Sequence, residues 1–205
     1  MWEILESIEN SGFATYVRET PNVLGYSTVL ALHTFGMAFL VGLSGMIALR
    51  ILGFAPGLPL APMEKFFPLI VIGFWVNAVT GLILVTLAAR SLLTNWDFYV
   101  KLVAIGCALV STRMLHANVF GDPANLDTRP VPMKGRILAC TTLTFWVIAI
   151  LAGRLTAYSG WIRRQTALAV LIAIVLLLAA RHLFTRFRGS DKAAHQAQAT
   201  ASTNY

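Results

Sequence analysis

Three polar side chains, His33, Asn77 and Lys101, lie in long apolar stretches of the sequence and are the residues best suited to binding a small molecule. Ionisable groups are costly inside hydrocarbon, so those found there usually pair with one another or mark a functional site. An imidazole, an amide and an ammonium group together offer both donors and acceptors of hydrogen bonds. We therefore predict a ligand pocket between these three side chains. The structural alternative is that each makes only helix–helix contacts.

His33 is the most informative of the three. Tyr26, Met37 and Ser44 fall near its face at helical spacing, which predicts that the imidazole points into a helix bundle. The functional interpretations are an axial haem ligand or a proton-accepting group. The alternative is a neutral histidine that is hydrogen-bonded to a neighbouring helix.

Small and weakly polar residues follow the other two candidates along their segments. Asn77, Thr80 and Gly81 form a polar stripe in one apolar run, and Lys101 opens a similar series in the next. Such stripes are typical of close helix–helix contacts in membranes. They also predict that neighbouring helices bring these side chains near His33.

Two further histidines, His116 and His182, raise the possibility of haem b, which membrane cytochromes hold between imidazoles on facing helices. Each lies 20 residues into its predicted span, and both spans run in the same direction. Equal depth makes them the better pair, because His33 and His116 would be offset by roughly 14 Å at 1.5 Å per residue. The alternative is that His116 and His182 only mark a membrane boundary.

Several other kinds of chemistry are disfavoured by the sequence. No Asp or Glu lies deep within a predicted span, which argues against a proton pump and against oxygen-ligated calcium or magnesium. Cys107 and Cys140 are not at metal-ligand spacing and are expected to be packing residues. No nucleotide-binding or hydrolase motif occurs, so we expect no stand-alone enzyme.

These candidates must be positioned by transmembrane helices. The chain has 205 residues, of which 57% are hydrophobic and only 12% charged, against about 25% charged in ordinary soluble domains. Apolar runs of about 20 residues must be helical in a bilayer, because every backbone group there needs an internal partner. The prediction is an all-α polytopic membrane protein with about five spans: 20–49, between 65 and 90, 96–120, 133–158 and 162–187.

The ends of the chain differ from this bundle. Residues 1–20 alternate apolar and acidic residues at helical spacing, which predicts an amphipathic helix at the membrane interface or across the bundle mouth, interrupted near Asn10 to Gly12. Residues 189–205 are small and polar, so a disordered tail is expected. The predicted domains are thus 1–20, the bundle 21–188, and the tail 189–205.

Basic residues indicate the orientation. With five spans, nine Lys and Arg residues fall on the side of the C-terminus and six on the side of the N-terminus. Basic loops stay in the cytoplasm, so the N-terminus is predicted outside and the C-terminus inside. The net charge of +7 is explained in this way rather than by nucleic acid, since no basic patch lies on a soluble segment. The expected partners are the lipid bilayer and other membrane subunits.

His33 is followed by Gly36 and the run 49–53, and Lys101 and His116 stand in a later apolar segment. On these residues, the stretch of about 20–120 resembles a family of small bacterial inner-membrane proteins of unknown function. Leu30 stands where the family pattern would place an acid, three residues before the histidine. The resemblance implies a polytopic protein of a bacterial cytoplasmic membrane and implies no activity.

Two functions are therefore carried forward from the sequence. The first is a membrane subunit or accessory module that binds a small ligand at His33, Asn77 and Lys101. The second is a b-type cytochrome with haem at His116 and His182. A small transporter lacks the broken helices and inverted repeat that would support it.

Overall fold

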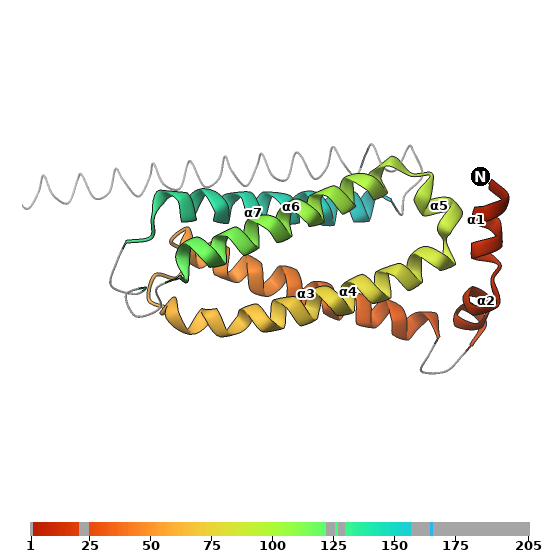
Figure 1. Cartoon of the computed structure of the whole chain (residues 1–205), viewed down its shortest axis with the longest axis horizontal. Coiled ribbons are helices and arrows are strands. Elements are labelled where there is room, and N and C mark those ends of the chain that lie inside the picture. The colour runs from red at the N-terminus through yellow and green to blue at the C-terminus, as the bar shows by residue number, and fades with distance from the viewer. Residues whose placement is uncertain (1, 21–24, 122–125, 127–129, 157–164, 166–205) are drawn as a thin grey trace, which may run out of the picture. The chain divides into compact units, whose positions relative to one another are not determined.

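A computed structural model describes residues 2–20, 25–121, 126, 130–156 and 165 of the chain (Figure 1). Almost all of these residues belong to one compact unit, Met1–Thr156. The described residues form helices and turns, and no strand occurs among them. The predicted all-α class is therefore confirmed. The predicted fifth span and the polar tail lie outside the described residues, apart from Gln165.

Four helices of the unit are long and the others are short. The long ones are α3 (Tyr26–Ile51), α4 (Phe67–Leu87), α6 (Trp96–Val119) and α7 (Met133–Leu155). The short ones are α1 (Trp2–Glu9), α2 (Gly12–Glu19), the 3₁₀ helix η1 (Ala61–Phe66) and α5 (Ala89–Leu93). Counting η1 with α4, four of the described helices are long and apolar enough to cross a membrane, and they coincide with the first four predicted spans.

Local sequence explains where the long helices begin and end. α3 begins at Tyr26, after Gly25, so it starts later than the apolar run that begins at Thr20. It ends before Gly53, whose φ of +97° lies in the left-handed region that favours glycine. Pro68 lies in the first turn of α4, where a missing backbone N–H costs little.

Nearby residues also determine where α6 begins and where α4 ends. The side chain of Asn95 caps α6 by accepting from the backbone N–H of Asp97 at 3.1 Å. Between α4 and α5 the helix is broken at Ala88, with φ −140° and ψ 40°. The short helix α5 was not predicted from the sequence, because an alanine gives no signal for a break.

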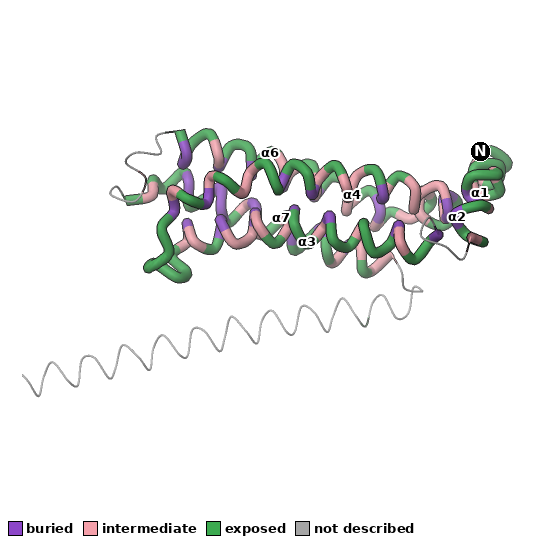
Figure 2. Tube along the Cα trace, turned by 90° about the horizontal axis from the view of Figure 1, so that it is seen from below, coloured by how far each residue is buried: buried purple, intermediate pink, exposed green. Residues whose placement is uncertain are grey.

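The four long helices pack as two pairs. α3 packs along α4, α6 packs along α7, and α3 also contacts α7 (Figure 1). The buried residues lie on the sides that face one another, as the purple segments in Figure 2 show. The main core comes from all four helices and includes Leu40, Ile47, Leu115 and Trp146.

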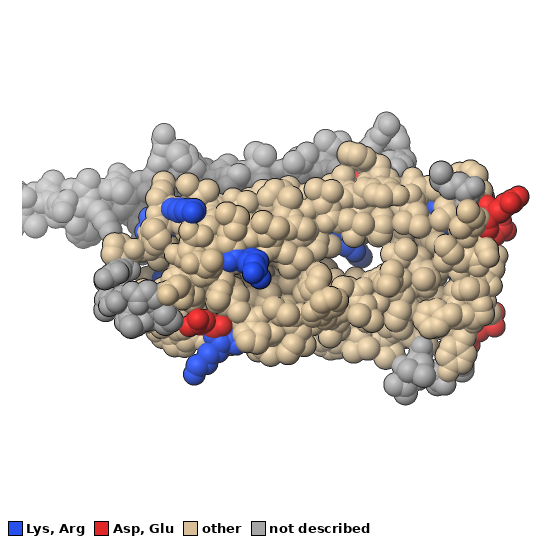
Figure 3. Space-filling model, viewed as in Figure 1, with Lys and Arg blue, Asp and Glu red and all other residues tan. Residues whose placement is uncertain are grey.

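The outward faces of the long helices are apolar as well. Exposed large hydrophobic residues include Phe35 on α3, Val79 on α4, Val103 on α6 and Ile137 on α7. Soluble monomers rarely expose apolar surface on this scale. Acidic side chains gather at the end of the molecule where α1 lies, and much of the surface between the ends carries no charge (Figure 3).

The two N-terminal helices pack at one end of the bundle. α1 contacts α4 and α5, and α2 contacts α3 and α4. Arg18 of α2 donates hydrogen bonds to the backbone oxygen atoms of Glu9 and Leu87, at 3.2 and 2.9 Å. The guanidinium of Arg90 lies 5.1 Å from the ring centre of Trp2. The break between α1 and α2 falls at Asn10 and Ser11, within the predicted interruption.

Candidate ligand-binding site

A cavity of about 600 Å³ opens between α4 and α6. These two helices meet near one end of the bundle, where the rings of Phe67 and His116 lie 4.2 Å apart between centres. They diverge toward the other end, where α5 joins them (Figure 1). The space-filling view shows the molecule hollowed in this region, with a basic side chain at the edge of the opening (Figure 3). The cavity therefore exists because the two helix pairs splay apart.

All three predicted ligand-binding residues line this one cavity. His33 reaches it from α3, Asn77 from α4 and Lys101 from α6. They are far apart in the sequence and come from three different helices. The rest of the lining is mostly apolar and includes Leu82, Val85, Leu93, Leu102 and Ile105. Pockets of this size with few polar groups on an apolar wall are typical of small-molecule sites.

The ring of His33 is oriented by α4. Its Nδ1 lies 3.1 Å from the backbone oxygen of Asn77 and 3.1 Å from Oγ1 of Thr80. A carbonyl oxygen can only accept, and the hydroxyl of Thr80 itself donates to the backbone oxygen of Val76. Nδ1 therefore carries the proton. Nε2 has no hydrogen-bond partner among the described residues, so in the neutral ring it is an available acceptor.

The side chain of Asn77 forms a second hydrogen bond between α4 and α3. Its Nδ2 donates to the backbone oxygen of His33 at 2.9 Å, so His33 and Asn77 are bonded to one another in both directions. One N–H of the amide is used in this bond, and an amide group has two. The other N–H is available to a molecule in the cavity.

Glycines allow α3 and α4 to approach closely enough for these bonds. A Cβ added to Gly36 would lie 2.7 Å from the backbone nitrogen of Asn77, and one added to Gly73 would lie 3.0 Å from the backbone oxygen of Gly36. A Cβ at Gly36 would force the helices apart, because the atom it meets belongs to the backbone, and one at Gly73 would be tightly crowded. Gly81 leaves room for the imidazole itself, because its Cβ would lie 3.1 Å from Cε1 of His33.

Lys101 is held against α7. A Cβ added to Gly153 would lie 3.3 Å from Cδ and 3.7 Å from Nζ of Lys101, so the lysine stem crosses the space that this glycine leaves open. Lys101 is half-buried and lines the cavity. Its ammonium group forms no hydrogen bond or ion pair with any described residue. The sequence analysis did not single out Gly153, whose only signal is a small residue in an apolar run.

The two histidines of the haem hypothesis are not both described. His116 lies at the far end of α6, where Nε2 is 3.8 Å from Oε1 of Glu64 and the ring contacts Phe67 and Phe120. His182 lies outside the described residues, so the proposed pair stays a prediction.

His33 and His116 lie at well separated levels along α4. His33 contacts Thr80 and His116 contacts Phe67, and these two α4 residues are separated by about 20 Å at 1.5 Å per residue. One iron could not bridge that distance. Among the described residues, no group of three or more His, Cys, Asp or Glu side chains could hold a metal ion.

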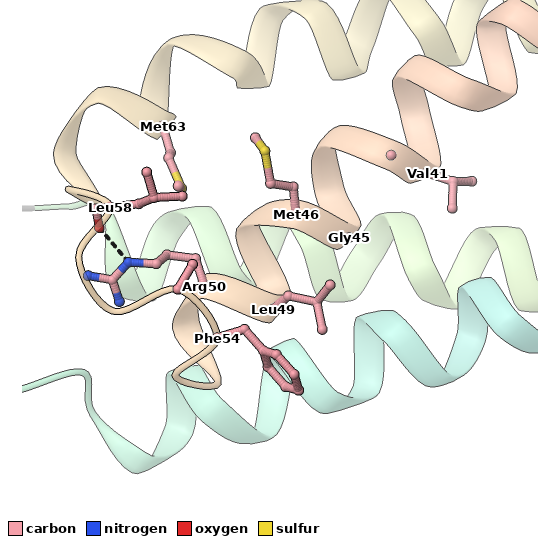
Figure 4. A pocket seen from close by; sticks show the side chains of 10 residues that line it. Val41, Gly45, Met46, Leu49, Arg50, Phe54, Leu58 and Met63 are labelled. Carbon is pink, nitrogen blue, oxygen red and sulfur yellow. Dashed lines mark hydrogen bonds between the residues drawn. The ribbon is translucent and has the colours of Figure 1, made fainter. Parts of the chain in front are cut away.

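A second hollow of about 450 Å³ lies near the end of α3 (Figure 4). Its wall includes Met46, Leu49 and Met63, and Arg50 lies at its edge. The guanidinium of Arg50 donates to the backbone oxygen atoms of Leu58 and Pro56. Because these bonds fasten the loop that follows α3, the arginine is already used structurally, and this hollow is the weaker candidate.

Comparisons with protein-family models, curated proteins and solved structures find no match to this chain. The class of the protein is therefore assigned from its helices. Four of those described are long and apolar enough to cross a membrane. The chain is a helical-bundle membrane protein. Its candidate site is the cavity between the two helix pairs of this bundle.

Proposed function

We propose that the protein is a small-ligand-binding module of a membrane, acting as a subunit or accessory protein rather than as a stand-alone enzyme. The observation that supports this most directly is the convergence of His33, Asn77 and Lys101 on one cavity. In a purely structural role such groups would be hydrogen-bonded to one another, as His33 and Asn77 are. Lys101 instead has its ammonium group beside a cavity and no bonded partner among the described residues.

The proposed membrane arrangement has five spans, with residues 1–20 at the interface. The protein lies in a bacterial cytoplasmic membrane with the N-terminus outside and the C-terminus inside. The excess of basic residues on the C-terminal side supports this orientation. Under it, the cavity opens in the outer half of the bilayer, at the end of the bundle where α1 and α2 pack.

The outward apolar faces support membrane partners. Residues such as Trp75 and Val79 on α4 are more than half exposed. Lipid chains cover such faces, and other membrane subunits can do so as well. The ligand is accordingly expected to reach the cavity from the bilayer or from a neighbouring subunit.

Filling the cavity tests the proposal. Ala78 lines the cavity, whereas the adjacent Val79 is 56% exposed and is not part of its lining. The full-length protein, in phosphatidylcholine nanodiscs, would be titrated with labelled 1-decanol, with empty nanodiscs as background. We expect protein-dependent binding that Ala78→Trp abolishes and that Val79→Trp leaves intact. Binding that survives both substitutions, or that never exceeds the background, would reject the proposal.

A further inference from the structure

The charge of the cavity is unbalanced. Lys101 contributes a positive charge, and none of the described residues that line the cavity is Asp or Glu. An ammonium group in an apolar site is stabilised mainly by an anion or by several hydrogen-bond acceptors, because it has lost much of its water. The lining therefore offers a place for one negative charge.

The position of this charge is set by packing. The stem of Lys101 lies over Gly153, with Cδ closest to that glycine, so the side chain crosses toward α7. The surrounding residues from α6 are Phe98, Leu102 and Ile105, which supply no acceptor side chain. Thr156 of α7 also lines the cavity, but its hydroxyl donates to the backbone oxygen of Ala152 at 2.8 Å, so among the described lining residues the fixed positive charge comes from Lys101.

A second set of polar groups faces the same space from the other helix pair. Asn77 has one amide N–H beyond its bond to His33, and His33 has Nε2 beyond its bond to α4. A carboxylate accepts up to about four hydrogen bonds, so the N–H groups of both Lys101 and Asn77 suit one acid group. Charge-assisted bonds of this kind are stronger than neutral ones.

The remainder of the cavity suits a hydrocarbon body. Leu82, Leu84 and Val85 of α4 and Leu93 of α5 supply much of the apolar lining. A volume of about 600 Å³ lies within the range of small-molecule pockets, which is about 300–1,000 Å³. Such a space suits a single chain better than a lipid with two chains.

We propose that the cavity binds a single-chain amphiphile with one acid group, the carboxylate on Lys101 and Asn77 and the chain along the α4 and α5 wall. This inference rests on the proposed function, because it names the class of ligand for the same cavity. The carboxylate remains intact, and no bond is made or broken.

The test compares two probes that differ only in the head group. Labelled decanoate and 1-decanol would be titrated into the full-length protein in phosphatidylcholine nanodiscs, with empty nanodiscs and the Ala78→Trp variant as backgrounds. We expect the wild type to bind decanoate about tenfold more tightly than decanol, as one charge-assisted bond provides. Lys101→Met should remove this preference, and Lys101→Arg should keep it.

The outcomes distinguish the acid-group proposal from the proposed function. Equal affinity of the wild type for decanoate and decanol would overturn the acid-group proposal while leaving a ligand-binding cavity. Unchanged decanoate affinity in a folded Lys101→Met variant would overturn it too. The wild-type comparison needs no variant, so it holds even where Lys101→Met does not fold. Absence of binding of both probes would instead overturn the proposed function itself.

Discussion

At the scale of single residues, His33 and Lys101 serve different purposes. His33 is tied to α4 through Nδ1, and Asn77 is tied back to α3, so both hold a helix pair together as well as lining the cavity. Lys101 forms no hydrogen bond or ion pair with a described residue. Removing the hydrogen bonds of the first should therefore lower stability, and removing the charge of the second should act mainly on ligand binding.

The substitution His33→Leu tests this distinction. It removes the bonds from Nδ1 to Asn77 and Thr80 but leaves the bond from Asn77 to the backbone of residue 33. We expect the free energy of unfolding in detergent to fall by about 1 kcal/mol, the usual size of an interhelical hydrogen bond in a membrane protein. Thr34→Val is the control, because the exposed hydroxyl of Thr34 bonds only within α3. Equal stability of the two variants would mean that the His33 bonds contribute nothing.

At the scale of elements, the closeness of α3 and α4 positions the site. Gly36 and Gly73 meet at the crossing, one turn from the bonds between His33 and Asn77. Small residues permit such approach in membrane helices, where packing rather than the hydrophobic effect drives association. The second pair is fastened differently, by a buried hydrogen bond of 3.0 Å from Thr142 of α7 to Ser111 of α6.

Gly36→Ala should disrupt the first pair. Its Cβ would lie 2.7 Å from a backbone nitrogen, which cannot move aside as a flexible side chain can. We expect a loss of about 1–3 kcal/mol in the free energy of unfolding, typical of overpacking. Gly42→Ala in the same helix is the matched control, since nothing lies within 4 Å of its Cβ. That variant should be neutral or up to about 1 kcal/mol more stable. Equal stability of both variants would contradict the close crossing.

At the scale of the whole molecule, the two helix pairs meet at one end and open at the other. The closed end is filled by core residues such as Leu60, Met63 and Phe120, and by the contact of His116 with Phe67. At the open end α5 separates the ends of α4 and α6, and α1 packs against it. The cavity therefore belongs to the arrangement of the whole bundle and to no single helix.

The proposed orientation predicts the results of reporter fusions. A fusion after Gly57, between the first two spans, and a fusion at Tyr205 should both report the cytoplasm. A truncated fusion after Thr94, between α5 and α6, should report the opposite side and serves as the control. The physical reason is the retention of basic loops in the cytoplasm. A fusion at Tyr205 that reports the side of Thr94 would contradict both the orientation and the five-span count.

The apolar helices could be predicted from the sequence alone. An uncharged apolar run long enough to cross a bilayer has no stable alternative to a helix, because unpaired backbone groups cannot be left in hydrocarbon. The charge-free run 20–49 illustrates this, because most of it forms α3 (Tyr26–Ile51). The three polar residues of the candidate site were also visible, since polar groups stand out in apolar runs.

What only the tertiary structure decided is which of these groups meet. The sequence left His33, Asn77 and Lys101 open between a pocket and ordinary helix contacts, and it gave no indication of the glycine beneath Lys101. Neighbouring helices in a bilayer are chosen by the fit of small surfaces, such as Gly36 against Gly73, and not by the hydrophobicity that all of them share. The splay between α4 and α6, and with it the cavity, results from that choice of neighbours.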